Sequence, residues 1–326
     1  MFLSALSAQV DLYYQKTFGR GANYEDLFYV ASELRDELVS EADNPIVATA
    51  MEILRSRCDF DLPQLTYSLD NIRDLVACSL RKPATRLDHL QPLTAVWKES
   101  PLQTLDIFTV NHDLLLEQYL LSQNIPFADG FDAAINNVQY WNPSVFGANV
   151  HGVRLLKLHG SIDWYRFRPD GSSSWYDDLI GKPGSTDISH TLDPWGKSQL
   201  PVDKRPLLLI GTFNKISEYT RRIFLDLYYE FSRILDRTTM LVSCGYGFGD
   251  KGVNERILQW LYGDRKRRIV LIEPKPDELQ RSARPAVSLK WDMWCKAGTL
   301  TIIPKGIEEV SWDEVKAKFG QRTSSS

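Results

Sequence analysis

The sequence predicts an α/β fold in which a mostly parallel sheet is flanked by helices and preceded by a helical segment. After residue 102, short apolar runs rich in β-forming residues alternate with longer amphipathic stretches. Such runs are typical of strands that are buried on both faces of a parallel sheet. With 326 residues, 43% of them hydrophobic, the chain is long enough for one large domain or a domain with an insertion.

The first hundred residues predict helices. In residues 26–39 apolar side chains recur at three- and four-residue steps, which is the spacing of a helix with one buried face. Asn44 is a plausible cap for a second helix, because Pro45 after it is a residue favoured at the first helical position. Residues 71–80 continue the helical pattern. We therefore expect residues 1–100 to form a mostly helical segment packed on the core.

The strands of the sheet are predicted by six apolar runs, which are residues 102–110, 153–160, 206–211, 238–246, 267–274 and 299–304. Helical patterns lie between them, at residues 113–123, 217–237 and 252–263. Together they predict a Rossmann-like core over residues 101–310, followed by a C-terminal helix and tail over 311–326. Residues 169–201 are rich in Gly, Ser, Pro and Asp and predict a loop, of a length that is often functional.

Composition excludes several classes of protein. A net charge of −4 gives no overall basic footprint for nucleic acid. Cys58, Cys78, Cys244 and Cys295 form no C-x-x-C pair, which excludes a four-cysteine zinc ribbon and favours buried thiols in a reducing compartment. No apolar run approaches the ~18 residues of a membrane span, and the N-terminus lacks the cationic region of a signal peptide. We expect a cytoplasmic protein that does not enter a membrane.

Ligands of open α/β sheets bind at the carboxyl ends of the strands, so the residues that follow each run are the candidates for a site. Four of the six runs end in polar or glycine-rich sequence. The candidates at these ends are Thr109, Asn111, Asp113, His159, Gly160, Gly245, Tyr246, Phe248, Asp250 and Glu273.

Each residue type has a chemical use at such an edge. His159 is suited to act as a general base, and the Asn111 amide offers both a donor and an acceptor to a ribose hydroxyl or a water. The glycines before the helix near residue 251 allow backbone to approach a ribose or phosphate at a helix N-terminus. Glu273 after a Rossmann strand is placed to accept hydrogen bonds from ribose hydroxyls.

The same residues also have purely structural interpretations. Asn111 and Asp113 are good caps for the helix that follows, Asp250 is a good cap for the next one, and His159 could be a core histidine held by backbone. Two further histidines, His112 and His151, are expected on the surface. Trp164, Trp175 and Trp260 are expected in packing. Residues 265–268 are expected in a solvated basic turn, with a patch that binds phosphate or a partner as the alternative.

The chain resembles the sirtuin-like NADase family of bacterial antiphage defence proteins, which are zinc-free relatives of the sirtuins. The resemblance lies in the order of four motifs: TVNHD (109–113), KLHG (157–160), CGYGFGD (244–250) and IEP (272–274). That family has a T-x-N-x-D sequence, a strand ending in His-Gly, and a glycine-rich turn that opens a helix. The positions that match are Thr109, Asn111, Asp113, His159, Gly160, Gly245, Phe248 and Asp250.

The resemblance implies that NAD is the substrate and that its nicotinamide–ribose bond is cleaved without a metal. In that family the asparagine, here Asn111, orients the ribose and the attacking water, and the histidine, here His159, serves as base. The other candidates at the strand ends would contact NAD. Whether NAD is hydrolysed or cyclised is left open, and so is the trigger for activity.

A second interpretation belongs to another class of function. The family normally opens with a strand and a GAG-type loop, and nothing similar stands before Asn23. This difference leaves two explanations open, a shortened N-terminus or a degenerate protein. In the second case we expect a catalytically weak scaffold or sensor that binds NAD or ADP-ribose. The resemblance implies a homo-oligomer and a partner such as a DNA-translocating ATPase or an Argonaute-like protein. A nuclease is the third interpretation, but the acidic, lysine or histidine pattern of metal-dependent cleavage is not found in the sequence.

Overall fold

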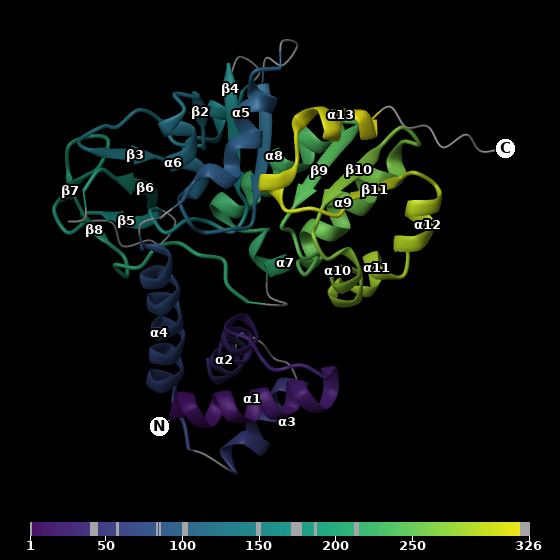
Figure 1. Ribbon diagram of the computed structural model, residues 1–326. Coiled ribbons are helices and arrows are strands. Elements are labelled where there is room, and N and C mark those ends of the chain that lie inside the picture. The colour runs from purple at the N-terminus through teal and green to yellow at the C-terminus, as the bar shows by residue number, and fades with distance from the viewer. Residues whose placement is uncertain are drawn as a thin grey trace. The chain divides into compact units, whose positions relative to one another are not determined.

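The computed structural model describes residues 2–39, 45–56, 59–82, 84, 86–99, 104–147, 151–170, 178–185, 188–211 and 215–319. It confirms the predicted class, a mixed α/β fold with parallel sheets flanked by helices and a helical N-terminal segment (Figure 1). The chain divides into two compact units. The first comprises Met1–Lys82 with Leu208–Ser217, and the second Pro83–Leu207 with Glu218–Ser326.

The first unit is built from α1 (Phe2–Phe18), α2 (Tyr24–Leu38), α3 (Pro45–Arg55) and α4 (Leu62–Leu80). Two of these helices begin at a capping box, in which Asn23 and Asp61 each accept a hydrogen bond from the backbone three residues on. Helix α2 contacts the other three, and Leu6, Leu34 and Leu65 are buried in this unit. Asn44, predicted as a cap, lies outside the described residues.

Two three-stranded parallel sheets form the centre of the second unit. The order in one is β1 (Thr104–Thr109), β4 (Gly152–Lys157), β2 (Phe127–Ala128). The order in the other is β11 (Leu300–Ile303), β10 (Arg268–Ile272), β9 (Met240–Cys244). Thr109 lies opposite Lys157 in the first sheet, and Cys244 opposite Ile272 in the second. The central strands β4 and β10 carry most of the buried apolar side chains of these two sheets.

Five of the six predicted runs therefore form strands, but the prediction for residues 206–211 is wrong. Only an isolated bridge occurs there, at Leu208. The backbone of Leu207 instead bonds to a loop: its N–H donates to the Trp164 carbonyl at 2.7 Å, and its carbonyl accepts from Ser161 at 3.2 Å. A run of apolar residues is buried here as an irregular segment, which periodicity alone does not distinguish from a strand.

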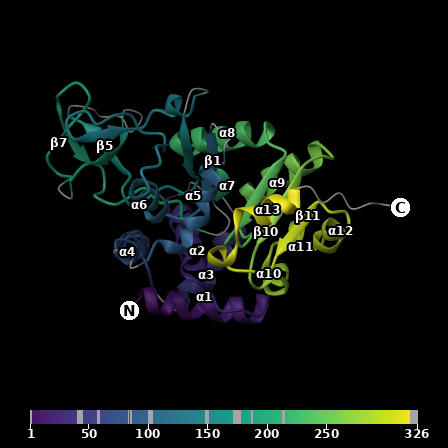
Figure 2. The same ribbon diagram turned by 45° about the horizontal axis from the view of Figure 1, so that its top comes forward.

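Helices cover these sheets. Their bounds are α5 (Gln91–Trp97), α6 (Leu115–Ser122), α8 (Arg222–Asp236), α9 (Lys251–Gly263), α10 (Pro276–Ser282), α11 (Pro285–Ser288), α12 (Trp291–Lys296) and α13 (Trp312–Phe319), with 3₁₀ turns η1 (Asp88–Leu90), η2 (Pro143–Phe146) and η4 (Ile307–Glu309). Helix α8 contacts β4 and α9, and its Phe231 ring lies 4.8 Å from that of Phe108 in β1. Helix α13 lies beside β10 in both views (Figures 1 and 2).

The helix predicted over residues 217–237 is interrupted. It consists of a short helix, α7 (Lys215–Glu218), and the longer α8, which begins at Arg222. Arg222, the first residue of α8, has a φ of 47°, in the left-handed region, so the right-handed helical backbone of α7 does not continue through it into α8. The break between the two helices begins at Tyr219.

The prediction of a loop over residues 169–201 is also wrong. This region contributes three strands to a five-stranded antiparallel sheet. The order is β3 (Val138–Tyr140), β6 (Leu179–Pro183), β5 (Tyr165–Pro169), β8 (Ser198–Pro201) and β7 (Thr191–Leu192). These strands are short and contain glycine and proline, so their apolar pattern is weak. Val138 and Phe167 are nevertheless fully buried and hold the sheet together.

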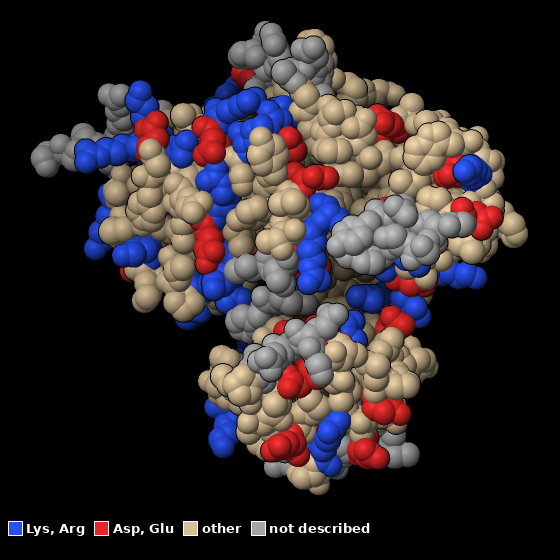
Figure 3. Space-filling model, turned by 180° about the vertical axis from the view of Figure 1, so that it is seen from behind, with Lys and Arg blue, Asp and Glu red and all other residues tan. Residues whose placement is uncertain are grey.

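The surface agrees with the composition. On the face shown in Figure 3, Lys and Arg are interspersed with Asp and Glu. Thiols are less buried than predicted, since Cys78 and Cys244 are exposed and Cys295 is half-buried, while Cys58 lies outside the described residues. Among the described helices, none is both long and apolar enough to cross a membrane.

Candidate functional site

The ends of β1 and β4 place Asn111 and His159 at one edge of the first parallel sheet. Thr109 pairs with Lys157, the last residues of the two strands, and each candidate lies two residues beyond the end of its strand. Asn111 is exposed, and its backbone N–H donates to Thr109 Oγ1 at 3.0 Å. Its side-chain amide makes no hydrogen bond within the described part of the chain. An exposed amide with this freedom is able to bind a ligand or a water.

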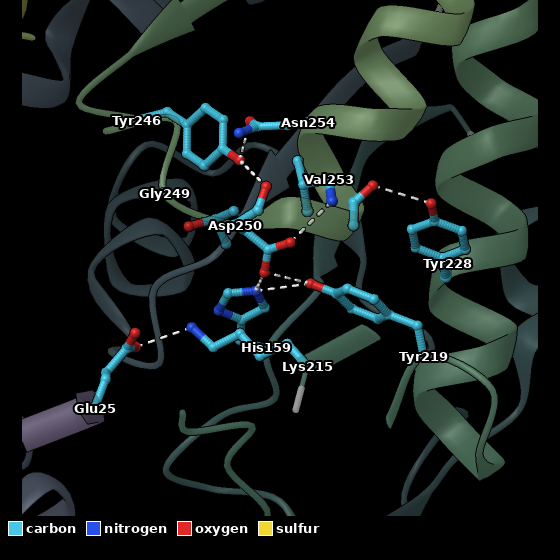
Figure 4. Close-up of polar contacts among 12 residues, drawn as sticks. Glu25, His159, Lys215, Tyr219, Tyr228, Tyr246, Gly249, Asp250, Val253 and Asn254 are labelled. Carbon is cyan, nitrogen blue, oxygen red and sulfur yellow. Dashed lines mark hydrogen bonds and ion pairs between the residues drawn. The ribbon is translucent and has the colours of Figure 1, made fainter. Parts of the chain in front are cut away.

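His159 is buried, with 3% of its surface exposed, and it lies in a cluster of three polar side chains (Figure 4). Its Nε2 is 2.9 Å from Asp250 Oδ2 and 2.8 Å from the Tyr219 hydroxyl. The Tyr219 hydroxyl in turn donates to the same Asp250 oxygen at 2.9 Å. Because the carboxylate can only accept, the hydrogen of a neutral His159 is on Nε2 and the lone pair is on Nδ1.

Asp250 uses both of its carboxylate oxygens. Oδ1 accepts a hydrogen bond from the Val253 backbone at 2.9 Å and caps α9, while Oδ2 holds His159 and Tyr219. The structural and the functional interpretation of Asp250 therefore describe two oxygens of one side chain. Since Asp250 follows β9 and His159 follows β4, their contact joins the carboxyl ends of the two parallel sheets.

Tyr219 was not among the sequence candidates. It lies 60 residues from His159 in the chain, at the break between α7 and α8, and no spacing in the sequence links the two. Burial and the adjacent Asp250 carboxylate raise the pKa of Tyr219 well above its usual value. The hydroxyl therefore remains a neutral donor to Asp250.

The turn after β9 is open on its outer side. A Cβ added at Gly245, Gly247 or Gly249 would meet no atom within 4 Å, and all three residues are exposed. Gly245 has a φ of +65°, which favours glycine. The backbone of this turn can therefore be approached closely at the N-terminus of α9.

The inner side of the turn is anchored. Phe248 is buried, with its ring 4.9 Å from that of Tyr246 and 6.2 Å from that of Trp291. The Tyr246 hydroxyl is 2.8 Å from Asn254 Oδ1, and the Asn254 amide donates to the Phe248 carbonyl at 2.8 Å. Tyr246 and Phe248 thus shape the turn from inside, and their side chains are engaged in packing.

The remaining candidates lie at the same strand ends. Glu273 is half-buried and accepts a hydrogen bond from the Lys275 backbone at 2.9 Å. Burial and the Glu273 carboxylate raise the pKa of the Cys244 thiol. Asp113 accepts from the Leu115 backbone at 3.0 Å at the start of α6, as a cap would, and Gly160 forms a turn with a φ of +81°. No group of three metal-ligating side chains gathers within the described ranges.

The prediction that His112 lies on the surface is wrong, although His151 is exposed as expected. His112 is buried, its Nδ1 lies 3.4 Å from the Gly160 carbonyl, and its ring lies 6.1 Å from that of His159. It is buried because the segment that follows β1 packs against the turn that follows β4. The expected basic turn uses its arginines locally, since Arg267 and Arg268 donate to backbone carbonyls.

The chain is thus an α/β protein whose parallel sheets carry a histidine–carboxylate pair, an exposed amide and a glycine-rich turn at their carboxyl edge, which is the edge where open α/β sheets bind ligands. The sequence profile of the SIR2-like domain matches residues 106–293, which is more than half of the chain. The chain therefore belongs to the SIR2-like domain family.

Two solved structures are similar to this chain. One is a SIR2 homologue in complex with NAD, with 13% identity, a TM-score of 0.43, and coverage of 97% of this chain and 86% of the other. The other is SIR2 bound to the inhibitor EX-527, 2′-O-acetyl-ADP-ribose and a deacetylated p53 peptide, with 11% identity, a TM-score of 0.39, and coverage of 79% and 85%. No curated protein matches the chain.

Proposed function

We propose that this protein is an NAD glycohydrolase that cleaves the nicotinamide–ribose bond of NAD and releases nicotinamide. One observation carries the proposal: His159, oriented by Asp250, lies at the same sheet edge as the exposed Asn111 amide. Membership in the SIR2-like family, whose enzymes generally depend on NAD, supports the choice of substrate.

In the proposed reaction the bond between the ribose C1′ and the nicotinamide nitrogen breaks, and nicotinamide leaves with the electron pair. The ribose passes through an oxocarbenium-like transition state, as in glycoside hydrolysis. A water adds to C1′ and loses a proton, so that NAD⁺ and water give ADP-ribose, nicotinamide and one proton.

His159 accepts that proton, from the water or from a ribose hydroxyl, on Nδ1, because Nε2 already carries a hydrogen toward Asp250. The Asp250 carboxylate then stabilises the imidazolium that forms. Asn111 holds the ribose hydroxyl or the water. The turn at Gly245–Gly249 lies against a ribose or phosphate of NAD, Glu273 accepts from ribose hydroxyls, and Thr109, Asp113 and Gly160 complete the edge.

The proposal is tested with Asn111→Ala and His159→Ala. Each is expected to abolish nicotinamide release, measured by chromatography, while circular dichroism shows an intact fold. His151→Ala is the matched control, because this exposed histidine directly precedes the amino end of β4, the strand that His159 follows. Turnover in the Asn111 and His159 variants equal to that of the control would refute the assignment.

A second candidate is a module that binds NAD or ADP-ribose without turnover. The burial of His159, at 3% exposure and with two partners on Nε2, favours it. Calorimetry with ADP-ribose separates the two candidates when it is run beside the nicotinamide assay. Binding without nicotinamide release selects the module, and release selects the enzyme.

The resemblance to defence NADases extends either candidate to a biological setting. We propose a cytoplasmic effector or sensor of antiviral defence that acts as a homo-oligomer or with a DNA-translocating ATPase or Argonaute-like partner. The motifs around Asn111, His159 and Asp250 support this extension.

A further inference from the structure

Lys157 is a buried cation just before the candidate histidine. Only 1% of its surface is exposed, and its Nζ donates to Glu117 Oε1 at 2.7 Å, to Ser161 Oγ at 2.9 Å and to the Asp113 carbonyl. The three hydrogens of the ammonium group thus have three acceptors. A buried charge requires such pairing, since an unpaired one is strongly unfavourable in the interior.

The three acceptors belong to the two segments that carry the site. Asp113 and Glu117 lie in the loop and helix that follow Asn111, whereas Ser161 lies in the turn that follows His159. Lys157 itself is at the end of β4. It therefore connects the backbone next to Asn111 with the strand that leads to His159.

Stability alone does not explain this cluster. Burial raises the pKa of Glu117 even though Lys157 opposes the shift, and Glu117 Oε2 has no hydrogen-bond partner in the described residues. Buried ion pairs are often no more stable than apolar side chains of similar volume. The cluster does, however, fix a geometry, because each donor direction of the ammonium group is used.

We propose that Lys157 is a positioning residue that holds Asn111 in register with His159, an inference that rests on the proposed function. The Asn111 amide has no hydrogen bond of its own in the described chain, so its place depends on the backbone of residues 111–113. Lys157 holds that backbone through the Asp113 carbonyl. A displacement of about 1 Å in such a site lowers the rate about 100-fold.

The chain offers a matched control in Lys182. Its side chain is 14% exposed, it forms an ion pair with Asp129, and it lies 3.9 Å from Asp163. It belongs to β6 of the antiparallel sheet and forms no ion pair or hydrogen bond with residues 111–117, and it acts on Glu117 only through the longer-range attraction of its charge. Lys182→Met and Lys157→Met therefore each remove one largely buried amine from a carboxylate.

We expect both variants to lower the melting temperature by similar amounts, but only Lys157→Met to lower kcat, by about 100-fold. KM for NAD and Kd for ADP-ribose should change less than about threefold, because the lost contact positions the reacting groups and not the ligand. The double variant Lys157→Met/Glu117→Leu removes both charges and should recover the melting temperature but not kcat. Equal kcat in the Lys157 and Lys182 variants would overturn the proposal.

A second readout separates this inference from the proposed function. Hydrogen–deuterium exchange of residues 110–117 should rise in Lys157→Met and remain at the wild-type level in Lys182→Met. If the wild-type protein releases no nicotinamide, the proposed function fails, and exchange alone decides the role of Lys157. Unchanged protection of this segment in Lys157→Met would then overturn the anchoring of the Asn111 loop.

Discussion

Asp250 shows how one side chain can serve a helix and a reaction together. One oxygen caps α9 and the other orients His159, so the capping geometry also sets the imidazole tautomer. The same orientation of a histidine by a carboxylate determines the general base in hydrolytic triads. The identity of the atom that faces Nε2 should therefore control activity more than it controls stability.

Asp250→Asn tests this argument. Asparagine is as good a cap as aspartate, but its amide would donate toward His159 Nε2 and move the imidazole hydrogen to Nδ1. We expect nicotinamide release to fall about 10²- to 10⁴-fold in kcat, with a change of no more than about 1 kcal/mol in the free energy of unfolding. Tyr219→Phe removes the tyrosine hydroxyl from Asp250 but keeps the contact between His159 and Asp250, so kcat should fall about tenfold or less. Wild-type kcat in Asp250→Asn would exclude a role for the tautomer.

The sequence could indicate part of this site. Asn111, His159 and Asp250 follow apolar runs, and the carboxyl ends of parallel strands converge, so their proximity follows from local patterns. The roles of Tyr219 and Lys157 were not predicted, because each depends on contacts that local sequence patterns do not show. The contact of Tyr219 depends on the break before Arg222, and a lysine within an apolar strand does not reveal which acceptors will surround it.

At the scale of elements, the glycine-rich turn combines an anchored interior with an open exterior. Its three exposed glycines differ in conformation, since Gly245 has a positive φ whereas Gly247 and Gly249 do not. Alanine at the first position would strain the backbone, and alanine at the others would only occupy open space. Stability and ligand binding can therefore be separated within one turn.

Gly245→Ala should lower the free energy of unfolding by about 1–2 kcal/mol, because an L-residue is disfavoured in the left-handed region. Gly247→Ala should leave it within about 0.5 kcal/mol of wild type, as at other unstrained surface positions. If backbone here approaches the ligand, Gly247→Ala should still weaken ADP-ribose binding, by about tenfold as measured by calorimetry. Wild-type affinity in Gly247→Ala would show that the ligand does not contact this part of the turn.

Strands were predicted best where both faces are buried. The central strands β4 and β10 carry nearly continuous buried apolar residues, which is the pattern that local reasoning detects. The antiparallel sheet was missed because its strands have two to five residues and include Gly181, Pro183 and Pro201. Their burial results from pairing between distant segments, which no single short run can show.

At the scale of the whole molecule, composition can only suggest boundaries between contiguous segments. The first compact unit is not contiguous, because Leu208–Ser217 joins the helices of Met1–Lys82. Part of the apolar run at 206–211, which the sequence presents as a strand, thus belongs to a helical unit. One contact between Leu208–Ser217 and these helices joins residues that are 190 positions apart, Glu25 and Lys215.

This long-range pair gives a prediction for the first unit. Lys215 Nζ is 2.9 Å from Glu25 Oε1, with side-chain exposures of 8% and 26%, and the pair links α7 to α2 (Figure 4). Exposed ion pairs contribute about 0–1 kcal/mol to stability, whereas breaking a fully buried pair costs about 3–5 kcal/mol. Because this pair is partly buried, Glu25→Gln should lower the free energy of unfolding by about 1–3 kcal/mol. Hydrogen–deuterium exchange in Leu208–Ser217 should rise at the same time, and the charge swap Glu25→Lys/Lys215→Glu should restore both. Asp88→Asn is the control, since it removes the far more exposed Arg86–Asp88 pair, with side chains 75% and 62% exposed, and should leave the free energy of unfolding close to that of wild type. If Glu25→Gln unfolds and exchanges like wild type, the segment is held by its apolar residues, among which Leu209 and Ile210 are buried.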